Sequence, residues 1–262
     1  MPIDRIRWKL IRITESHDPD LPCPRCGDIL KLLSETLRIE NDGMTSRCQS
    51  DPNWEPDFRT GSCTSMFRCR TEKCSETVSM CGHSSVDNID YENGNCDNVL
   101  HPTYFHPALH LFRVSSACPD IVTNEIVAGF SLFWCDKPGT LNHFRKAIEL
   151  LLDVLRVRKY RVVTEKGKNH RRPLSLHHRI NEFKKCDSIL GSQLEAVKWI
   201  GNSGSHSDDV DDEDVFDACD LLEHFIHERL ERRGTHIRKI TATINRSKKP
   251  RSHKKEKLKP QF

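Results

Sequence analysis

The sequence predicts an α+β protein in which helix dominates, with a small β-containing region, a helical bundle and a basic tail in that order. Cysteine pairs stand beside strand-like segments in the first part of the chain. From about residue 119 the apolar residues recur at helical spacing. The last stretch has too few apolar residues to offset its ordering entropy, so we expect it to be disordered. We place the three parts at residues 1–118, 119–233 and 234–262.

The amino-terminal part is predicted to contain few strands and long loops. Residues 5–13 alternate basic and apolar side chains, which predicts an edge strand with a wet, basic face. Residues 40–65 are rich in Asn, Asp, Ser and Pro and are expected to form an inserted loop. Residues 67–80 place a cysteine pair before a short alternating run, which predicts a turn and then a strand. Residues 82–103 contain Asn-Gly and His-Pro turn signals and are also expected to be loop.

Composition indicates a protein without a membrane span. Hydrophobic residues make up 36% of the 262 residues and charged residues 30%, and no apolar run approaches the ~20 residues that a membrane helix needs. The first residues carry charge throughout and lack the apolar stretch of a signal peptide, so we expect a cytoplasmic protein. Twelve cysteines in a reducing compartment indicate metal ligation or buried thiols in preference to disulfides.

Four cysteines have the spacing of a metal site. Cys23 and Cys26 form a Cys-x2-Cys pair among prolines and a glycine, and Cys69 and Cys74 form a Cys-x4-Cys pair. Two such pairs beside strand-like segments are typical of a zinc ribbon, in which four thiolates bind one Zn²⁺ tetrahedrally. Because protein ligands would fill all four positions, the metal would be structural. The alternative is that these thiols are only small buried hydrophobic groups.

Other thiols and histidines in this region raise the question of a second metal. Their spacings match no defined ligand template, and we interpret them first as loop thiols. Whether they form a site stays open at this point. The residues concerned are Cys48, Cys63, Cys81, Cys96, His83 and His101.

Five helices are predicted after residue 118. Pro119 suits the first turn of a helix, and the second helix is the clearest, with apolar residues at i, i+3, i+7, i+10, i+11 and i+14 from Leu141. The acidic run 208–214 opens the last helix, where the helix dipole favours negative charge, and is a weaker candidate for a cation site. A basic loop is expected at 158–173. The helices are expected at residues 119–133, 141–155, 176–186, 188–200 and 211–232.

Several stretches of this helical part resemble a known family. They are the run Phe144-Arg-Lys-Ala-Ile-Glu149, the stretch Val197-Lys-Trp-Ile-Gly-Asn-Ser-Gly-Ser-His206, the acidic segment, and Phe216-Asp-Ala-Cys-Asp-Leu-Leu222. Together they resemble the bacterial domain of unknown function 4145 family, which is related to the HEPN superfamily, named for higher eukaryotes and prokaryotes nucleotide binding. The resemblance covers about residues 119–232 and implies a HEPN-like helical bundle. The upstream cysteine pairs resemble the zinc-ribbon segment of many such proteins.

The resemblance also implies candidate catalytic residues. Active HEPN ribonucleases carry an arginine, a polar residue, spacers and a histidine on one helix, which corresponds to Asn202 and His206 here, whereas Gly201 stands at the arginine position. RNA cleavage without a metal needs a proton acceptor, which His206 can be, and a cation for the developing phosphate charge, which Gly201 cannot be. Lys198 or Arg145 are candidate substitutes. We therefore favour a non-catalytic role and leave enzyme activity uncertain.

Two basic segments indicate a nucleic-acid partner, with RNA and DNA both open. Residues 246–259 carry eight Lys or Arg residues, and a second basic patch extends over residues 158–172. Clustered cations are the electrostatic footprint of phosphate binding. The alternative is that they serve solubility without a specific target. The residues expected to bind nucleic acid are Lys248, Lys249, Arg251, Lys254, Lys255, Arg171 and Arg172.

The combined prediction is a non-catalytic, zinc-binding, HEPN-like module associated with nucleic acid. The family resemblance further implies a bacterial defence or restriction system, a defence-system protein partner and homodimerisation through the helical bundle. Two alternatives stay open. The first is a metal-independent endoribonuclease that uses His206, and the second is a protein-interaction scaffold.

Overall fold

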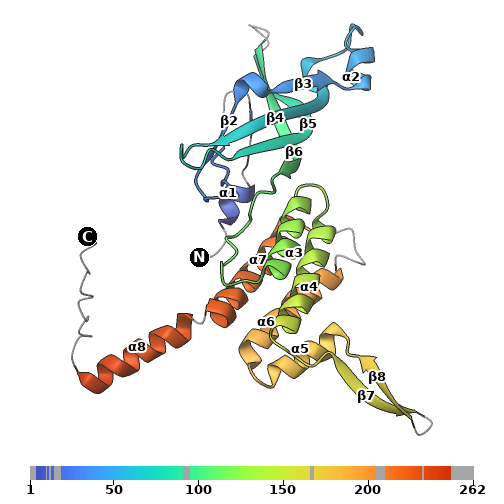
Figure 1. The fold of residues 1–262 in the computed structure, drawn as a ribbon. Coiled ribbons are helices and arrows are strands. Elements are labelled where there is room, and N and C mark those ends of the chain that lie inside the picture. Colours follow the sequence, from blue (N-terminus) through green and yellow to red (C-terminus); the bar gives the residue numbers. More distant parts are fainter. Residues whose placement is uncertain are drawn as a thin grey trace, which may run out of the picture.

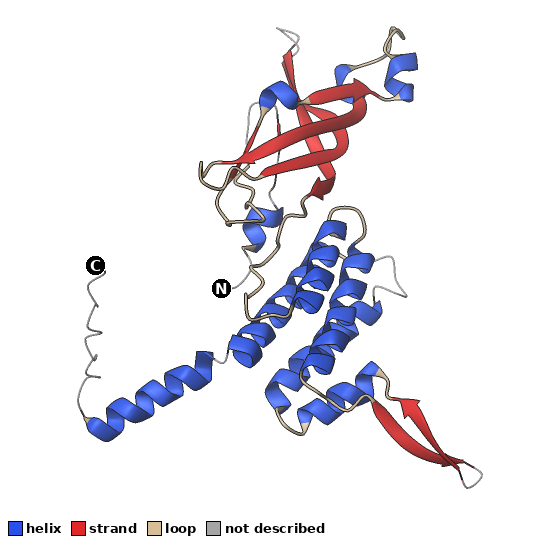
Figure 2. Cartoon of the chain, viewed as in Figure 1, coloured by secondary structure: helices blue, strands red, loops and turns tan. Residues whose placement is uncertain are grey.

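The chain folds into a sheet followed by a group of helices. The sheet comes from the first part of the chain and the helices from the second (Figures 1 and 2), which confirms the predicted α+β class. Among the described residues, no helix has both the length and the apolar character needed to cross a membrane. The computed structural model describes residues 4–9, 11, 13–14, 19–90, 95–165, 168–203, 210–231 and 233–248.

The amino-terminal sheet is antiparallel, in the order β1-β6-β5-β4-β2, and β3 also pairs with β4. Buried and exposed residues alternate along β4, because successive side chains of a strand point to opposite faces. On the buried face, Phe67 packs against Phe105 with ring centroids 6.1 Å apart. The strands are β1 (Ile13–Thr14), β2 (Leu30–Leu32), β3 (Arg38–Asn41), β4 (Thr60–Cys69), β5 (Thr77–Asp90) and β6 (Asn95–His106).

Two segments that the sequence predicts as loops contain regular structure. Residues 82–103 belong largely to β5 and β6, and the Asn-Gly signal at 93–94 lies outside the described residues. Pro102 lies opposite Gly82, beside a register shift, and such an irregularity tolerates a residue that cannot donate to the ladder. Residues 40–65 include the end of β3, the start of β4 and two short helices, α2 (Gly43–Cys48) and η2 (Pro56–Phe58). A further 3-10 turn, η1 (Ser34–Thr36), precedes β3.

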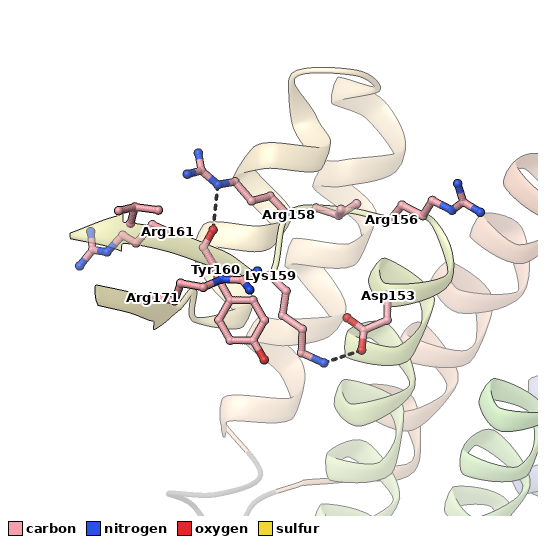
Figure 3. Close-up of a pocket in the computed structure, with 9 residues that line it drawn as sticks. Asp153, Arg156, Arg158, Lys159, Tyr160, Arg161 and Arg171 are labelled. Carbon is pink, nitrogen blue, oxygen red and sulfur yellow. Dashed lines mark hydrogen bonds and ion pairs between the residues drawn. The ribbon is translucent and has the colours of Figure 1, made fainter. Parts of the chain in front are cut away.

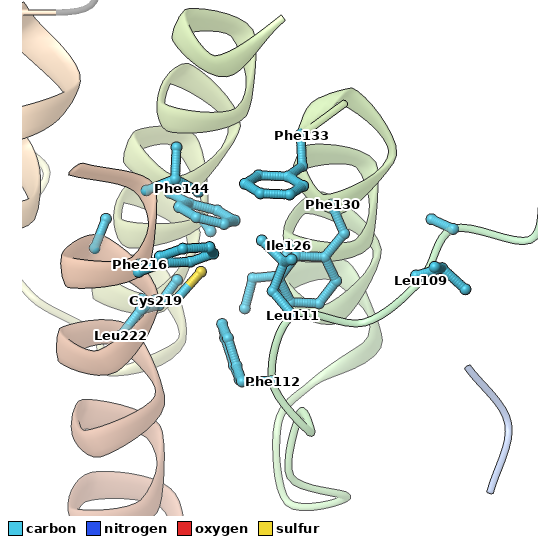
Figure 4. Close-up of a cluster of buried hydrophobic side chains, with 14 of the residues drawn as sticks. Leu109, Leu111, Phe112, Ile126, Phe130, Phe133, Phe144, Phe216, Cys219 and Leu222 are labelled. Atoms are coloured by element: carbon cyan, nitrogen blue, oxygen red, sulfur yellow. The ribbon is translucent and has the colours of Figure 1, made fainter. Parts of the chain in front are cut away.

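The helical part has its core where α3, α4 and α7 meet (Figure 4). Phe130 and Phe144, both fully buried, pack edge to face with centroids 5.9 Å apart. Asp211 caps α7 in a capping box with Asp214, which confirms the capping interpretation for the described end of the acidic run. The five predicted helices are all present, as α3 (Asp120–Leu132), α4 (Lys137–Val154), α5 (Leu176–Lys184), α6 (Ser188–Ser203) and α7 (Asp212–Ile226).

The predicted strand over residues 5–13 is wrong. This segment begins with helix α1 (Arg5–Lys9), and β1 follows it. The helix is fixed by distant contacts, since Arg5 forms an ion pair with Asp220 of α7 at 2.8 Å and Trp8 is buried against Phe133 with ring centroids 6.2 Å apart. A local period of two could not reveal either contact.

The basic loop predicted at 158–173 is a β-hairpin. Strands β7 (Tyr160–Glu165) and β8 (Lys168–Pro173) pair antiparallel, and they extend away from the helices as an arm (Figure 1). The first strand reads Tyr-Arg-Val-Val-Thr-Glu, which is rich in aromatic and β-branched residues that favour strands. We call residues 160–165 and 168–173 the basic arm.

The predicted disorder of residues 234–262 is wrong for the first half of that segment. The π-helical turn η3 (His227–Glu231) is followed by α8 (Arg233–Ser247). Ile237, Ile240 and Ile244 recur at helical spacing and give α8 an apolar stripe, which the charge count of the whole tail conceals. Residues 249–262 lie outside the described part of the chain.

Candidate metal centre and nucleic-acid interface

The four predicted metal ligands lie together. Cys23, Cys26, Cys69 and Cys74 place their sulfur atoms within 4.8 Å of one another, with 3.8 Å from Cys23 Sγ to Cys74 Sγ and 3.4 Å from Cys26 Sγ to Cys69 Sγ. Disulfide sulfurs would lie ~2.05 Å apart, so these are free thiols. Four sulfurs around a Zn²⁺ at the usual ~2.3 Å lie ~3.8 Å from one another. The cluster therefore fits one metal ion such as zinc.

The first cysteine pair is held in a tight turn. The Gly27 N–H donates to the Cys23 carbonyl at 2.8 Å, and the Cys23 N–H donates to the Asp28 carbonyl at 2.6 Å. Gly27 has a φ of 80°, in the left-handed region that glycine enters without steric cost. The glycine after the second cysteine is therefore what lets both sulfurs point to the same side.

The second pair is tied to the first through the sheet and its turns. Cys69 ends β4 and pairs directly with Leu30 of β2, which follows the first cysteine turn. The Arg70 N–H donates to the Ile29 carbonyl at 2.9 Å, and the Thr71 hydroxyl donates to the Asp28 carboxylate. These bonds bring two cysteine pairs that are 43 residues apart in sequence into one cluster.

The thiols of the cluster are in unlike environments. Burial raises the pKa of the Cys69 thiol to about 12 and also raises the pKa of Cys23. The pKa of the exposed Cys26 is lowered, chiefly because the Asp28 backbone N–H donates to its sulfur. A metal binds thiolates and releases their protons. A cation at the centre would thus offset the penalty that burial places on the thiolates.

The candidate second metal site does not form among the residues that the structure describes. Cys63 is buried on the inner face of β4, whereas Cys81 is exposed and pairs with Thr64 on the outer face. His83 and His101 stack with ring centroids 4.7 Å apart but belong to no metal-binding cluster of described residues. Cys48 is exposed on α2, and the side chain of Cys96 lies outside the description.

The predicted catalytic residues are only partly described. Lys198 is buried on α6, and its Nζ lies 3.4 Å from His177 Nδ1 and 3.4 Å from the Trp199 ring centroid. Burial lowers the pKa of Lys198. Asn202 is half-buried in the last turn of α6, and His206 lies outside the described residues. Sequence reasoning missed His177, because only the fold brings α5 beside α6.

The glycine at position 201 lies at a close contact between two helices. A Cβ at this position would lie 3.2 Å from the Leu141 carbonyl oxygen and 3.6 Å from the Arg145 Cβ. The position therefore faces α4, and the glycine lets the two helices approach closely. A larger side chain at 201 would press on this contact, so the glycine fits the close packing of α6 on α4.

A basic pocket of about 570 Å³ lies at the root of the arm. Its one carboxylate, Asp153, is already engaged, since Arg179 Nη2 lies 2.5 Å away and Lys159 Nζ 2.8 Å away. The Arg171 guanidinium stands over the Tyr160 ring, 5.0 Å from its centroid. Figure 3 shows Asp153, Lys159, Tyr160 and Arg171 at this pocket. The cations that line the pocket are Arg156, Arg158, Lys159, Arg161 and Arg171.

The other residues that are predicted to bind nucleic acid lie in different parts of the chain, and most of them are not described. Arg172 lies on β8, where it forms an ion pair with Glu165 at 2.5 Å. Lys248 is exposed just after α8. The remaining four residues, Lys249, Arg251, Lys254 and Lys255, lie outside the described part of the chain.

Two family models match the chain in separate segments. The domain of unknown function DUF8608 matches residues 12–108, which hold the sheet and the four cysteines. The domain of unknown function DUF4145 matches residues 130–254, which confirms the resemblance of the helical motifs and extends it through α8. No curated protein and no solved structure matches the chain significantly. The chain thus carries a DUF8608 domain with a four-cysteine cluster, followed by a domain of the DUF4145 family.

Proposed function

We propose that this protein is a non-catalytic nucleic-acid-binding module whose amino-terminal half is held together by one structural Zn²⁺. The basic pocket at the root of the arm carries the nucleic-acid proposal. Five cationic side chains line it against one carboxylate, and that carboxylate is already paired. The excess positive charge is matched by the phosphates of a nucleic-acid backbone.

The zinc assignment rests on the chemistry of the donors. Cys23, Cys26, Cys69 and Cys74 supply four thiols and close the coordination sphere, which is the arrangement of structural rather than catalytic zinc. A bound ion would cross-link the two cysteine turns, and four thiolate ligands would leave no coordination position for a substrate or a water.

Four of the five cations of the pocket have donors available to a ligand, because among them only Lys159 pairs with Asp153. Among the described residues, no carboxylate lies within ion-pair distance of Arg156, Arg161 or Arg171. Arg158 donates from Nε to the Tyr160 carbonyl at 2.8 Å, which holds the side chain at the pocket while leaving its terminal nitrogens for another acceptor. Guanidinium groups suit phosphate because they donate two parallel hydrogen bonds.

Fluorescence anisotropy with labelled DNA and RNA, over about 50 to 200 mM salt, tests the proposal. We expect affinity to fall steeply with salt, since each phosphate contact releases counterions and adds ~0.9 to the slope of log K against log salt. The triple variant Arg156→Ala/Arg161→Ala/Arg171→Ala should bind at least ~10-fold more weakly, with a slope smaller by about 2 to 3.

A matched control carries the same charge change elsewhere. Arg38→Ala/Arg47→Ala/Arg68→Ala removes three exposed arginines of the sheet half and should leave the affinity and the slope near the wild-type values. Thermal unfolding of both triple variants checks that they fold. Equal losses of affinity in the two variants would show that binding depends on the net charge alone. No binding by the wild type would favour a protein-interaction scaffold instead.

One observation favours a second candidate function, a metal-independent endoribonuclease. The Lys198 ammonium lies 3.4 Å from the half-exposed His177 imidazole, so a cation and a proton acceptor stand together on α5 and α6. Cleavage of end-labelled RNA with chelator present tests it, with His206→Ala and His177→Ala beside the wild type. Activity lost in either variant would establish an enzyme, whereas an inactive wild type would leave the binding module.

A further inference from the structure

We propose that the basic arm inserts into the major groove of B-form duplex DNA, with the face that carries Arg161 and Arg172 turned toward the bases. This inference rests on the proposed nucleic-acid function and narrows its partner to one class. Direct cross-strand partners share a face of a hairpin. We call one face of the arm the cationic face, formed by Arg161, Val163, Glu165, Lys168, His170 and Arg172.

The side chains of the arm are almost all exposed to solvent. Among its twelve described residues only Val163 is half-buried, and the others are exposed. A two-stranded hairpin of this kind is marginally stable on its own in water. Its stability is therefore expected to increase when a partner covers it.

The charge of the cationic face identifies the partner as an anion. Arg161 lies directly opposite Arg172, and like charges at such a position destabilise a hairpin. Arg172 is paired with Glu165, while Arg161 has no ion pair with a described carboxylate. A second copy of the arm would add more positive charge, whereas a nucleic acid would neutralise it.

The shape of the arm selects duplex DNA among nucleic acids. The major groove of B-DNA, ~12 Å wide and ~8.5 Å deep, admits a two-stranded ribbon. Strands of six residues extend ~20 Å at ~3.3 Å per residue, so the arm can lie along the groove with its cationic face toward the base edges. The major groove of duplex RNA is too narrow and deep for protein side chains to read.

The aromatic content of the arm argues against single strands. Proteins hold single-stranded nucleic acid largely by stacking bases on aromatic rings. Tyr160 is the only Phe, Tyr or Trp among the described arm residues. Its ring has the Arg171 guanidinium over it, and it lies on the face opposite Arg161. The cationic face thus offers hydrogen-bond donors and no stacking platform.

The cations of the arm and those of the root pocket would contact different parts of the DNA. Arg161 and Arg172 can donate to the O6 and N7 acceptors of guanine in the groove. Arg156 and Arg158 stand at the root pocket, where they would contact the phosphates that flank the groove and set the orientation of the arm.

The test compares three probes of one sequence, namely duplex DNA, duplex RNA and single-stranded DNA, with the full-length protein. We expect duplex DNA to bind at least ~10-fold more tightly than the other two. A ligand that occupies the DNA major groove should displace the protein, and a minor-groove ligand should not. Arg161→Ala/Arg172→Ala should remove the preference for duplex DNA while keeping a weaker, salt-dependent binding from the cations that remain at the root pocket, Arg156, Arg158, Lys159 and Arg171.

Control variants keep the outcome clear. Val162→Ala/Thr164→Ala changes the opposite face of the same hairpin and should keep the preference for duplex DNA. Equal, arm-dependent binding of all three probes, or displacement only by the minor-groove ligand, would overturn this inference and leave the nucleic-acid function standing. Absence of binding to every probe would overturn both.

Discussion

The two halves of this protein are stabilised by different means. The helical half buries four of the largest completely enclosed side chains, Phe130, Phe144, Phe216 and Phe225, whereas the sheet half buries Phe67 and Phe105. The sheet half instead places four thiols within 4.8 Å of one another, where β4 ends at Cys69. The helices rest on apolar burial, and the cysteine turns, made of Pro, Arg, Gly and Asp, have little apolar surface to bury. On the proposed function, a bound metal ion would order these turns by cross-linking them.

The largest effect is expected from breaking the metal cluster. Cys26→Ser removes one ligand at an exposed position and so creates no cavity. Structural zinc contributes on the order of 10 kcal/mol to small domains, so the cysteine turns should unfold while the helical half persists. We expect zinc content to fall from one ion per chain toward none, and limited proteolysis to cut between residues 19 and 76, with helical circular dichroism retained.

The control for this prediction is Cys48→Ser, because Cys48 is exposed and lies outside the cluster. It should leave zinc content and protease resistance unchanged. If Cys26→Ser kept both properties as well, the cluster would be a set of thiols without a structural ion.

The next largest effect should appear in the opposite half. Phe144 is fully buried in the contact between α3 and α4, and Phe144→Ala should cost about 3–5 kcal/mol. Urea unfolding followed by helical circular dichroism measures the loss. Phe144→Leu keeps more of the volume and should lose less. Zinc content should stay at the wild-type value, and a simultaneous loss of zinc would show that the two halves fold as one unit.

The smallest effect concerns pH and the root of the arm. Burial raises the pKa of Asp153, but hydrogen bonds from Lys159 and Arg179 outweigh this, so its pKa lies below the ordinary value. A lowered pKa contributes stability above about pH 4, the unfolded value, and the contribution disappears as pH falls through the lower folded value. Asp153→Asn should therefore cost up to ~1 kcal/mol at pH 7, reduced by solvent screening, and much less near pH 3.

Urea unfolding at both pH values measures this difference. Glu182→Gln is the matched control, because Glu182 pairs with Lys185 on the exposed surface of α5. It should change little at either pH. An Asp153→Asn loss of the same size at pH 3 and pH 7 would assign the effect to packing, not to the carboxylate charge.

The metal ligands and the helices could be predicted because their signals are local. Cys23 and Cys26 stand in a turn whose glycine adopts the required conformation, and Leu141, Phe144 and Ile148 mark one face of α4. Spacing along the chain is enough for both. The sequence also identified the basic segment that contains the arginines of β8, although it did not predict the hairpin that presents them.

The errors arose where distant contacts decide the local structure. Arg5 and Trp8 alternate like a strand but form a helix because α7 and Phe133 hold them. Residues 82–103 carry turn signals, yet pairing between β5 and β6 makes most of them strand. Propensity gives way to tertiary contacts in such segments.

By itself, the sequence determined the α+β class and the four cysteines that cluster, because spacing and period along the chain carry that information. The family of the helical part was indicated by the resemblance of its motifs. Only the tertiary structure decided that Gly201 serves the contact between α4 and α6 and that the cations of residues 156–171 gather at one pocket with a projecting arm. Such facts depend on which elements pack together, and packing is set by contacts between residues far apart in the chain.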